Sequence, residues 1–82
     1  MNVDATIVGI VPFEIEEDRY LTIYYVHDDD PDTILLARLP VSAIYDRPHP
    51  NDSVSIRYVL GVVTNIDQRE EAGAADAAKA AV

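Results

Sequence analysis

The sequence contains no cysteine, and this absence removes several kinds of site at once. Without thiols the chain cannot form a disulfide framework, a thiolate nucleophile or a cysteine-ligated zinc site. A cysteine-free chain fits an intracellular protein. Residues 1–6 include an acid where the first part of a secretory signal would carry a basic residue, so we expect a cytoplasmic protein.

Long apolar runs are also missing. The longest ones fall far short of the roughly 20 residues that a membrane helix needs, so we expect no membrane association. A chain of 82 residues has room for one domain. A domain of this size buries only about 60% of its unfolded surface, so its core is small.

Positive charge is scarce. Fifteen acidic residues stand against six basic ones, among them a single lysine, and the formal net charge is −9. Residues 1–66 alone carry eleven acids and four arginines, which gives them a net charge of 4 − 11 = −7. Such a field repels phosphate backbones and argues against nucleic acid as a partner. Three explanations stay open: solubility, adaptation to a salty cytoplasm, and an acidic surface for a basic protein, including mimicry of nucleic acid.

What the chain does have is β-type alternation, clearest in residues 53–67. Val54, Ile56 and Tyr58 alternate with polar neighbours, as in a strand with one buried face. Gly61 interrupts the pattern before a second β-rich run, which predicts a hairpin with Gly61 at its turn.

Residues 1–16 predict another long strand. Near Gly9 both faces are apolar, so we expect a bend or a bulge there. Pro12 cannot donate a ladder hydrogen bond and should lie at an edge or beyond a change of partner. The alternation puts seven side chains on one face: Val3, Ala5, Ile7, Gly9, Val11, Phe13 and Ile15.

Two further strands are expected at residues 20–27 and 33–39. Residues 16–19 form a charged turn before the first of them, and the acidic run at residues 28–32 should break the chain before the second. Pro40 fits the start of a short helical turn, and residues 46–52 have the composition of a loop.

Together these patterns predict an all-β fold, a small five-stranded barrel that is either OB-like or SH3-like. A short helical turn joins strands three and four. The barrel is expected to span residues 1–67. Residues 68–82 are rich in alanine and predict a disordered or weakly helical tail.

The acidic run resembles a calcium loop only in part. Asp28, Asp30 and Asp32 take the first, third and fifth positions of an EF-hand-type loop. Thr33 stands in place of the glycine and Leu39 in place of the bidentate glutamate. We therefore expect a solvated turn and no metal site.

No constellation for catalysis or for a cofactor is visible. His27 and His49 are the only histidines and fall in different predicted elements. The serines have no glycine-rich loop or nucleophile elbow around them. We expect a non-catalytic protein without a cofactor.

The best binding candidates are tyrosines and arginines on predicted strands: Tyr20, Tyr24, Arg38 and Arg57. Both residue types are enriched at protein interfaces, so we expect a module that binds a protein through this face or through an edge strand, with self-association as one form. The alternative is a single-stranded nucleic-acid binder of OB type, with bases stacked on the tyrosines. A second alternative, an acidic mimic of nucleic acid, requires residues 14–18 and 28–32 to merge into one negative band.

Overall fold

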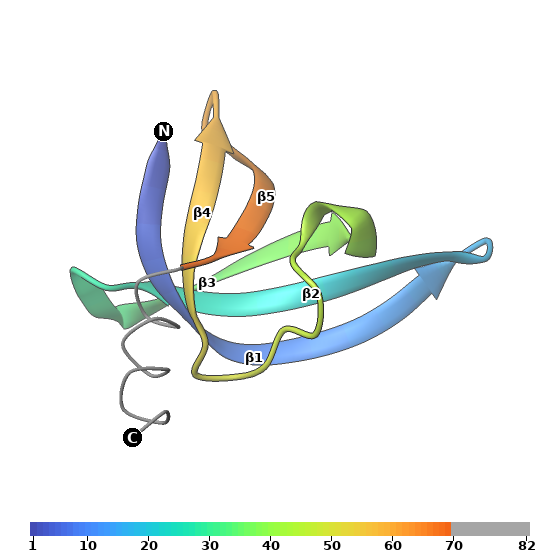
Figure 1. Cartoon of the computed structure of the whole chain (residues 1–82), viewed down its shortest axis with the longest axis horizontal. Helices are drawn as coiled ribbons and strands as arrows, with labels where there is room; N and C mark the ends of the chain where they lie inside the picture. Colours follow the sequence, from blue (N-terminus) through green and yellow to red (C-terminus); the bar gives the residue numbers. More distant parts are fainter. Residues whose placement is uncertain (70–82) are drawn as a thin grey trace, which may run out of the picture.

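A computed structural model describes residues 1–69 as five β-strands and one short 3-10 helix. The strands form one antiparallel sheet in the order β3-β2-β1-β4-β5 (Figure 1). The all-β prediction is confirmed. The predicted tail lies outside the described residues apart from Gln68, which ends the last strand, and Arg69. The elements are β1 (Asn2–Ile15), β2 (Asp18–His27), β3 (Asp30–Pro40), η1 (Val41–Ala43), β4 (Ser53–Val59) and β5 (Val62–Gln68).

The long strand β1 joins the two halves of the sheet. Its first part, from Asn2 to Thr6, pairs with β4, and the part from Ala5 onward pairs with β2. Pro12 therefore lies beyond the last pairing with β4, where its missing N–H leaves no ladder bond unmade. This is the change of partner that the proline predicted.

A bulge in β1 changes which side chains of this strand lie on the same face of the sheet. The pairing with β2 shifts register between Ile7 and Gly9, so Val8 has no partner on β2. An extra residue reverses every later side chain, because side chains alternate with a period of two. Gly9, Val11 and Phe13 consequently lie on the face opposite to Ile7, and the prediction that all of them share one face was wrong.

The acidic run also differs from the prediction. Only Asp28 and Asp29 form the turn, and β3 already begins at Asp30. Pro31 and Asp32 fit within β3 because it is an edge strand and both side chains are exposed. An edge position needs no donor on its free side and leaves a carboxylate in water.

The core lies between the two halves of the sheet. Its fully buried side chains come from β1, β2, β4 and β5, and Ile66 is the single buried residue of β5. Ile44, which follows η1, is also buried and pairs with Ile66 through an isolated bridge. The predicted helical turn after Pro40 is confirmed as η1, and it brings Ile44 onto the core.

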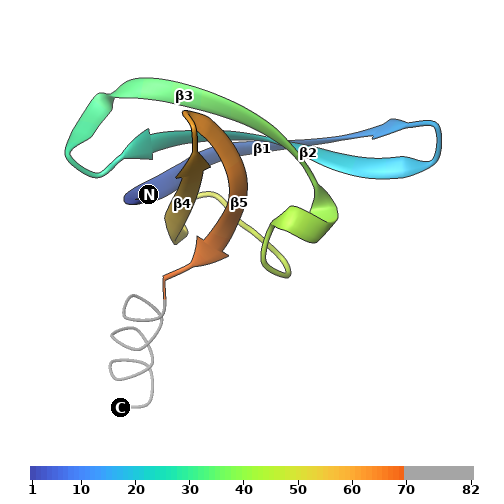
Figure 2. The same cartoon turned by 90° about the horizontal axis from the view of Figure 1, so that it is seen from above.

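The sheet curls but does not close. Its edge strands β3 and β5 come near each other, as the view from above shows (Figure 2). The two strands are not hydrogen-bonded neighbours in the sheet. The segment that follows η1 contacts β5 instead, where the Tyr45 N–H donates to the Ile66 carbonyl at 3.3 Å. The closed barrel expected from the sequence is thus not confirmed.

Candidate functional site

Three of the four predicted binding residues share the outer face of β1, β2 and β3. Cross-strand pairing places Tyr20 beside Phe13 and Tyr24 beside Gly9, while Arg38 lies opposite Thr22. The rings of Phe13 and Tyr20 are stacked with centroids 5.4 Å apart and planes 20° apart. We call Phe13, Tyr20, Tyr24 and Arg38 the aromatic face.

The aromatic face is hollowed. A depression of about 400 Å³ is bordered by Tyr24, Phe13 and Arg38, with Val11 and Thr22 also lining it. Thr22 is buried although it points away from the core, because the larger side chains around it cover it. A second hollow of about 460 Å³ borders the stacked pair but does not belong to the aromatic face, because Pro12, Leu21 and Val41 line it from the opposite side.

Phe13 belongs to this face although the sequence placed it on the same side as Ile7. The bulge at Val8 turns it outward, where its ring covers Tyr20. The apolar pattern around Gly9 was the signal that a register shift would occur there.

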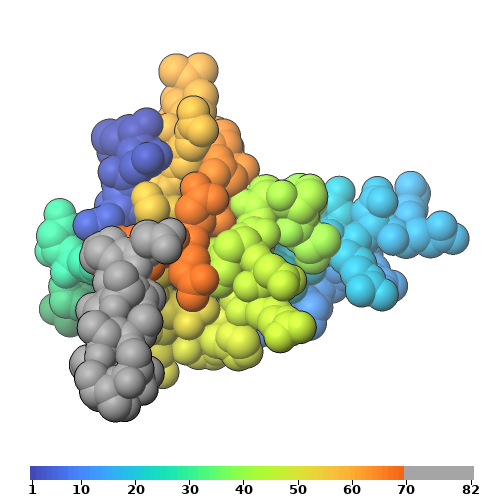
Figure 3. Space-filling view, viewed as in Figure 1, coloured from blue at the N-terminus to red at the C-terminus, as the bar shows by residue number. Residues whose placement is uncertain are grey.

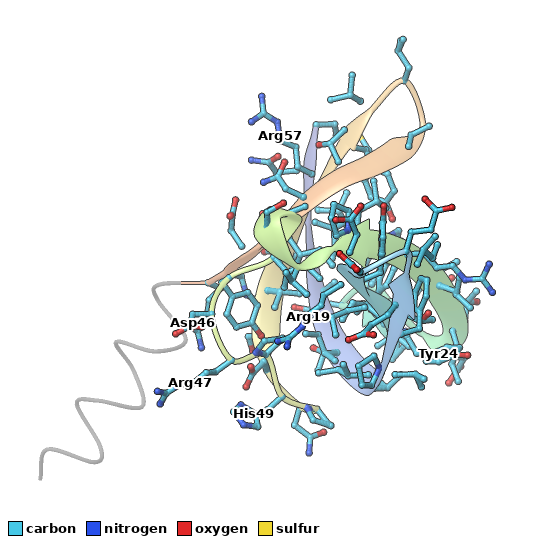
Figure 4. The ribbon with its side chains drawn as sticks, turned by 90° about the vertical axis from the view of Figure 1, so that its right-hand side faces the viewer. Arg19, Tyr24, Asp46, Arg47, His49 and Arg57 are labelled. Carbon is cyan, nitrogen blue, oxygen red and sulfur yellow. The ribbon has the colours of Figure 1, made fainter. Side chains whose placement is uncertain are left out.

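Arg57 lies elsewhere. It is exposed on β4 between Asn2 of β1 and Asn65 of β5, in the half of the sheet that does not carry the aromatic face. Figure 4 shows Arg57 above the centre of the view and Tyr24 at its lower right. The predicted set of four is therefore not one surface: the structure brings Tyr20, Tyr24 and Arg38 together and leaves Arg57 out.

A hydrogen-bonded polar cluster lies on the inner side of the sheet. The Tyr58 hydroxyl is 2.8 Å from the Tyr25 hydroxyl and 2.8 Å from His27 Nε2. Burial raises the pKa of Tyr25 above its ordinary value, and the hydrogen bond with Tyr58 adds to the shift. The cluster ties β2 to β4 across the core, which gives it a structural role.

The second histidine has a different setting. His49 lies in the loop of residues 46–52. The Tyr45 hydroxyl, just before this loop, donates to Asp52 Oδ2 at 2.5 Å, and the His49 backbone N–H donates to the same atom. Burial raises the pKa of the Tyr45 hydroxyl, and the hydrogen bond to Asp52 adds a smaller part of the shift. The His49 side chain is exposed on this loop (Figure 4). Within residues 1–69 no group of three or more His, Asp or Glu side chains could hold a metal ion.

Arg69 is a residue that the sequence analysis missed. Its guanidinium lies 3.1 Å from Asp4 Oδ2 and 2.9 Å from Asp28 Oδ2, and its side chain is only 16% exposed. Asp28 also accepts a hydrogen bond from the Thr6 hydroxyl. One arginine thus links the end of β5 to β1 and to the β2–β3 turn.

Replacing Arg69 by alanine should lower the free energy of unfolding by about 1 kcal/mol, because a partly buried ion pair with two carboxylates is lost. Urea unfolding measures this change. Arg57→Ala is the matched control, since Arg57 is exposed and has no ion pair within residues 1–69, and it should change the free energy by less than about 0.5 kcal/mol. Equal effects of the two substitutions would contradict the proposed link.

The acidic residues do not merge into one band. Residues 14–18 surround the β1–β2 turn and residues 28–32 surround the β2–β3 turn, and these turns lie at opposite ends of β2. In Figure 3 the two turns project on opposite sides of the molecule. The geometric requirement of the nucleic-acid mimic is therefore not met by these two groups.

No helix among the described residues has the length and apolar character to cross a membrane. No family model, no curated protein and no solved structure matches this chain. The aromatic face, its hollow and the two sheet edges are therefore the basis for inferring a function.

Proposed function

We propose that the chain is a non-catalytic, cytoplasmic binding module that recognises a protein through its aromatic face. The fold that fits this role is a small barrel of OB-like topology. In support, β1 pairs with both β2 and β4, and the open edges β3 and β5 are adjacent. The SH3-like alternative has no comparable support in the strand order.

The observation that carries the proposal is that Phe13, Tyr24 and Arg38 border a hollow on one face, with Tyr20 stacked on Phe13 beside it. Aromatic side chains supply large contact areas with few rotatable bonds, and arginine combines a charge with a planar surface. Interfaces concentrate their binding energy in such residues when they surround a pocket. A protein with one apolar or aromatic side chain for the hollow fits this face.

The nucleic-acid alternative has one point in its favour, because stacked aromatic rings and Arg38 share a face as in a base-stacking platform. It needs several arginines on that face to neutralise phosphates. Arg57 lies away from it, and Arg19 pairs with Glu14 at 3.9 Å. A protein partner therefore remains the better-supported proposal.

The test is capture of partners by the full chain, with comparison of two double variants. Tyr20→Ala with Tyr24→Ala should lower the capture of specific partners at least tenfold, as expected for the loss of two central aromatic anchors. The matched control, Leu60→Ala with Val62→Ala, removes exposed apolar side chains away from the face and should leave capture unchanged. Quantitative mass spectrometry of the captured proteins measures both.

Two outcomes would change the proposal. If the partners stay bound to the tyrosine variant, the aromatic face does not take part in the interaction. If the chain binds a labelled single-stranded oligonucleotide in a salt-sensitive manner and the same variant loses this binding, the partner is nucleic acid and not a protein.

A further inference from the structure

The turn between β4 and β5 carries apolar side chains that nothing in the described part of the chain covers. Val59 pairs with Val62, so the turn itself consists of two residues, Leu60 and Gly61. Leu60 is 98% exposed, and Val59 and Val62 are exposed as well. Met1, which is 81% exposed, lies at the same end of the molecule (Figure 1). We call Met1, Val59, Leu60 and Val62 the apolar tip.

The backbone of this turn is one that leucine rarely adopts. Leu60 has a φ of 54° and Gly61 a φ of 80°, and both values lie in the left-handed region. Two-residue hairpin loops with two positive φ angles favour Asn-Gly or Asp-Gly, because a bulky side chain is strained there. Leu60 buries almost none of its surface within the described residues, so the fold gains nothing from it in return. Strain at an exposed position of this kind indicates a contact with another molecule.

A hollow beside the turn is large enough to receive such a side chain. It has a volume of about 710 Å³. Its lining comes from both ends of the sheet and is mostly apolar: Met1, His27, Leu35, Tyr58, Val59, Leu60 and Gly61. The Tyr58 hydroxyl and His27 Nε2 already bond each other at 2.8 Å, so this polar pair needs no further partner from a ligand. The apolar tip thus places a projecting leucine next to a hollow for one.

Charge is nearly absent from this end of the molecule. Residues 53–66 contain one charged side chain, Arg57, although the chain has a net charge of −9. No residue that lines the hollow is acidic. Two copies that meet here bring no carboxylate of the apolar tip into the contact, which limits their mutual repulsion. A basic protein would instead favour the acidic residues 14–18 and 28–32, and a negatively charged bilayer would repel the chain.

We propose that the apolar tip is the contact surface of a weak homodimer and packs on the apolar tip of a second copy about a twofold axis. Such a contact requires one surface that is complementary to itself. The apolar tip meets this requirement because its projection and its hollow lie side by side, so the axis carries each Leu60 to the hollow of the other copy. The contact is small, which predicts a transient dimer with a dissociation constant of roughly 10 μM to 1 mM.

The first experiment is sedimentation equilibrium of the full chain at fixed ionic strength, together with urea unfolding at low protein concentration. Leu60→Asn should raise the dimer dissociation constant at least about tenfold, because it puts a polar amide into an apolar contact. The same substitution supplies the Asn-Gly pair that this turn favours, so the urea midpoint of the monomer should stay equal or rise. A purely structural role of Leu60 predicts a lower midpoint instead.

Two further variants separate the dimer from other effects. Ile15→Asn is the matched control, because Ile15 is also an exposed apolar residue beside a hairpin turn, and it should change the dissociation constant by less than about twofold. Leu60→Ala with Val62→Ala should weaken the dimer but leaves the aromatic face intact. Tyr20→Ala with Tyr24→Ala should leave the dimer intact. The inference and the proposed function can therefore fail independently.

The second experiment maps the contact by the change of amide chemical shifts with protein concentration. The shifts that change should lie at Met1, at Leu35 and in residues 58–62. A chain that stays monomeric at about 1 mM would overturn the inference. So would a dimer that Leu60→Asn leaves unchanged, a dimer that Ile15→Asn weakens equally, or concentration-dependent shifts confined to the aromatic face.

Discussion

Replacing Ile66 by alanine is expected to lower the free energy of unfolding by about 3 kcal/mol, with a range of roughly 2–5 kcal/mol for such substitutions. Ile66 is fully buried and is the only buried side chain of β5. It packs where β5 meets both Ile56 of β4 and Ile44. A small domain with a total stability of about 4–12 kcal/mol would lose a large share of it.

Urea unfolding followed by circular dichroism measures this loss. Val62→Ala is the matched control because Val62 lies on the same strand and is largely exposed, and we expect a change below about 0.5 kcal/mol. If both substitutions cost the same, β5 would not be held by Ile66. A selective rise in amide hydrogen exchange along β5 would show that this strand loosens first.

The second large effect is a loss of stability at alkaline pH. Tyrosine in an unfolded chain ionises with a pKa of about 10. Burial raises the pKa of Tyr25 and Tyr45 well above this value, and the hydrogen bonds with Tyr58 and Asp52 add to the shift. Below pH 10 both states keep these protons, so the tyrosines add no pH dependence there.

Above pH 10 the unfolded chain loses protons that the folded chain retains. The unfolded state then binds fewer protons, so the free energy of unfolding falls as pH rises. The expected slope is up to about 1.4 kcal/mol per pH unit for each tyrosine, and about 2 to 3 kcal/mol per unit for both. Urea titrations between about pH 8.5 and 11.5 measure it, because Lys79 is the only lysine that titrates in this window.

Phenylalanine substitutions assign the slope to its source. Tyr25→Phe and Tyr45→Phe should each flatten the alkaline fall, and the double variant should remove most of it. Both also lower the stability at pH 7, by about 1 kcal/mol, because a buried hydrogen bond is lost. A double variant with the original slope would show that other groups cause the alkaline unfolding.

The strands could be predicted well because apolar and polar residues alternate within the sequence of each strand, without reference to its neighbours. Val54, Ile56 and the following Tyr58 face inward as expected, and Gly61 has the positive φ of 80° that the hairpin turn needs. The helical turn after Pro40 and the place of Pro12 also follow from local chemistry. These features depend on neighbours in the sequence and on little else.

Features that depend on pairing could not be predicted in the same way. The bulge at Val8 reversed the faces of Val11 and Phe13, and alternation cannot show at which residue a register shift occurs. The separation of Arg57 from Tyr24 follows from the strand order. The link from Arg69 to Asp4 and Asp28 joins residues far apart in the chain, and Arg69 falls in the stretch 68–82 that was predicted to be a tail.

The double pairing of β1 also has a consequence for synthesis. The β1–β2–β3 meander uses partners that follow one another closely, so it can form as soon as these strands leave the ribosome. Asn2 pairs with Arg57, and the Met1 amino group donates to the Tyr58 carbonyl. β1 is therefore made before its partner β4, and residues 2–4, which do not pair with β2, stay without a neighbouring strand until β4 follows. Delaying β4, by rare codons or by a stalled chain ending near residue 50, should expose this edge to aggregation or chaperone binding.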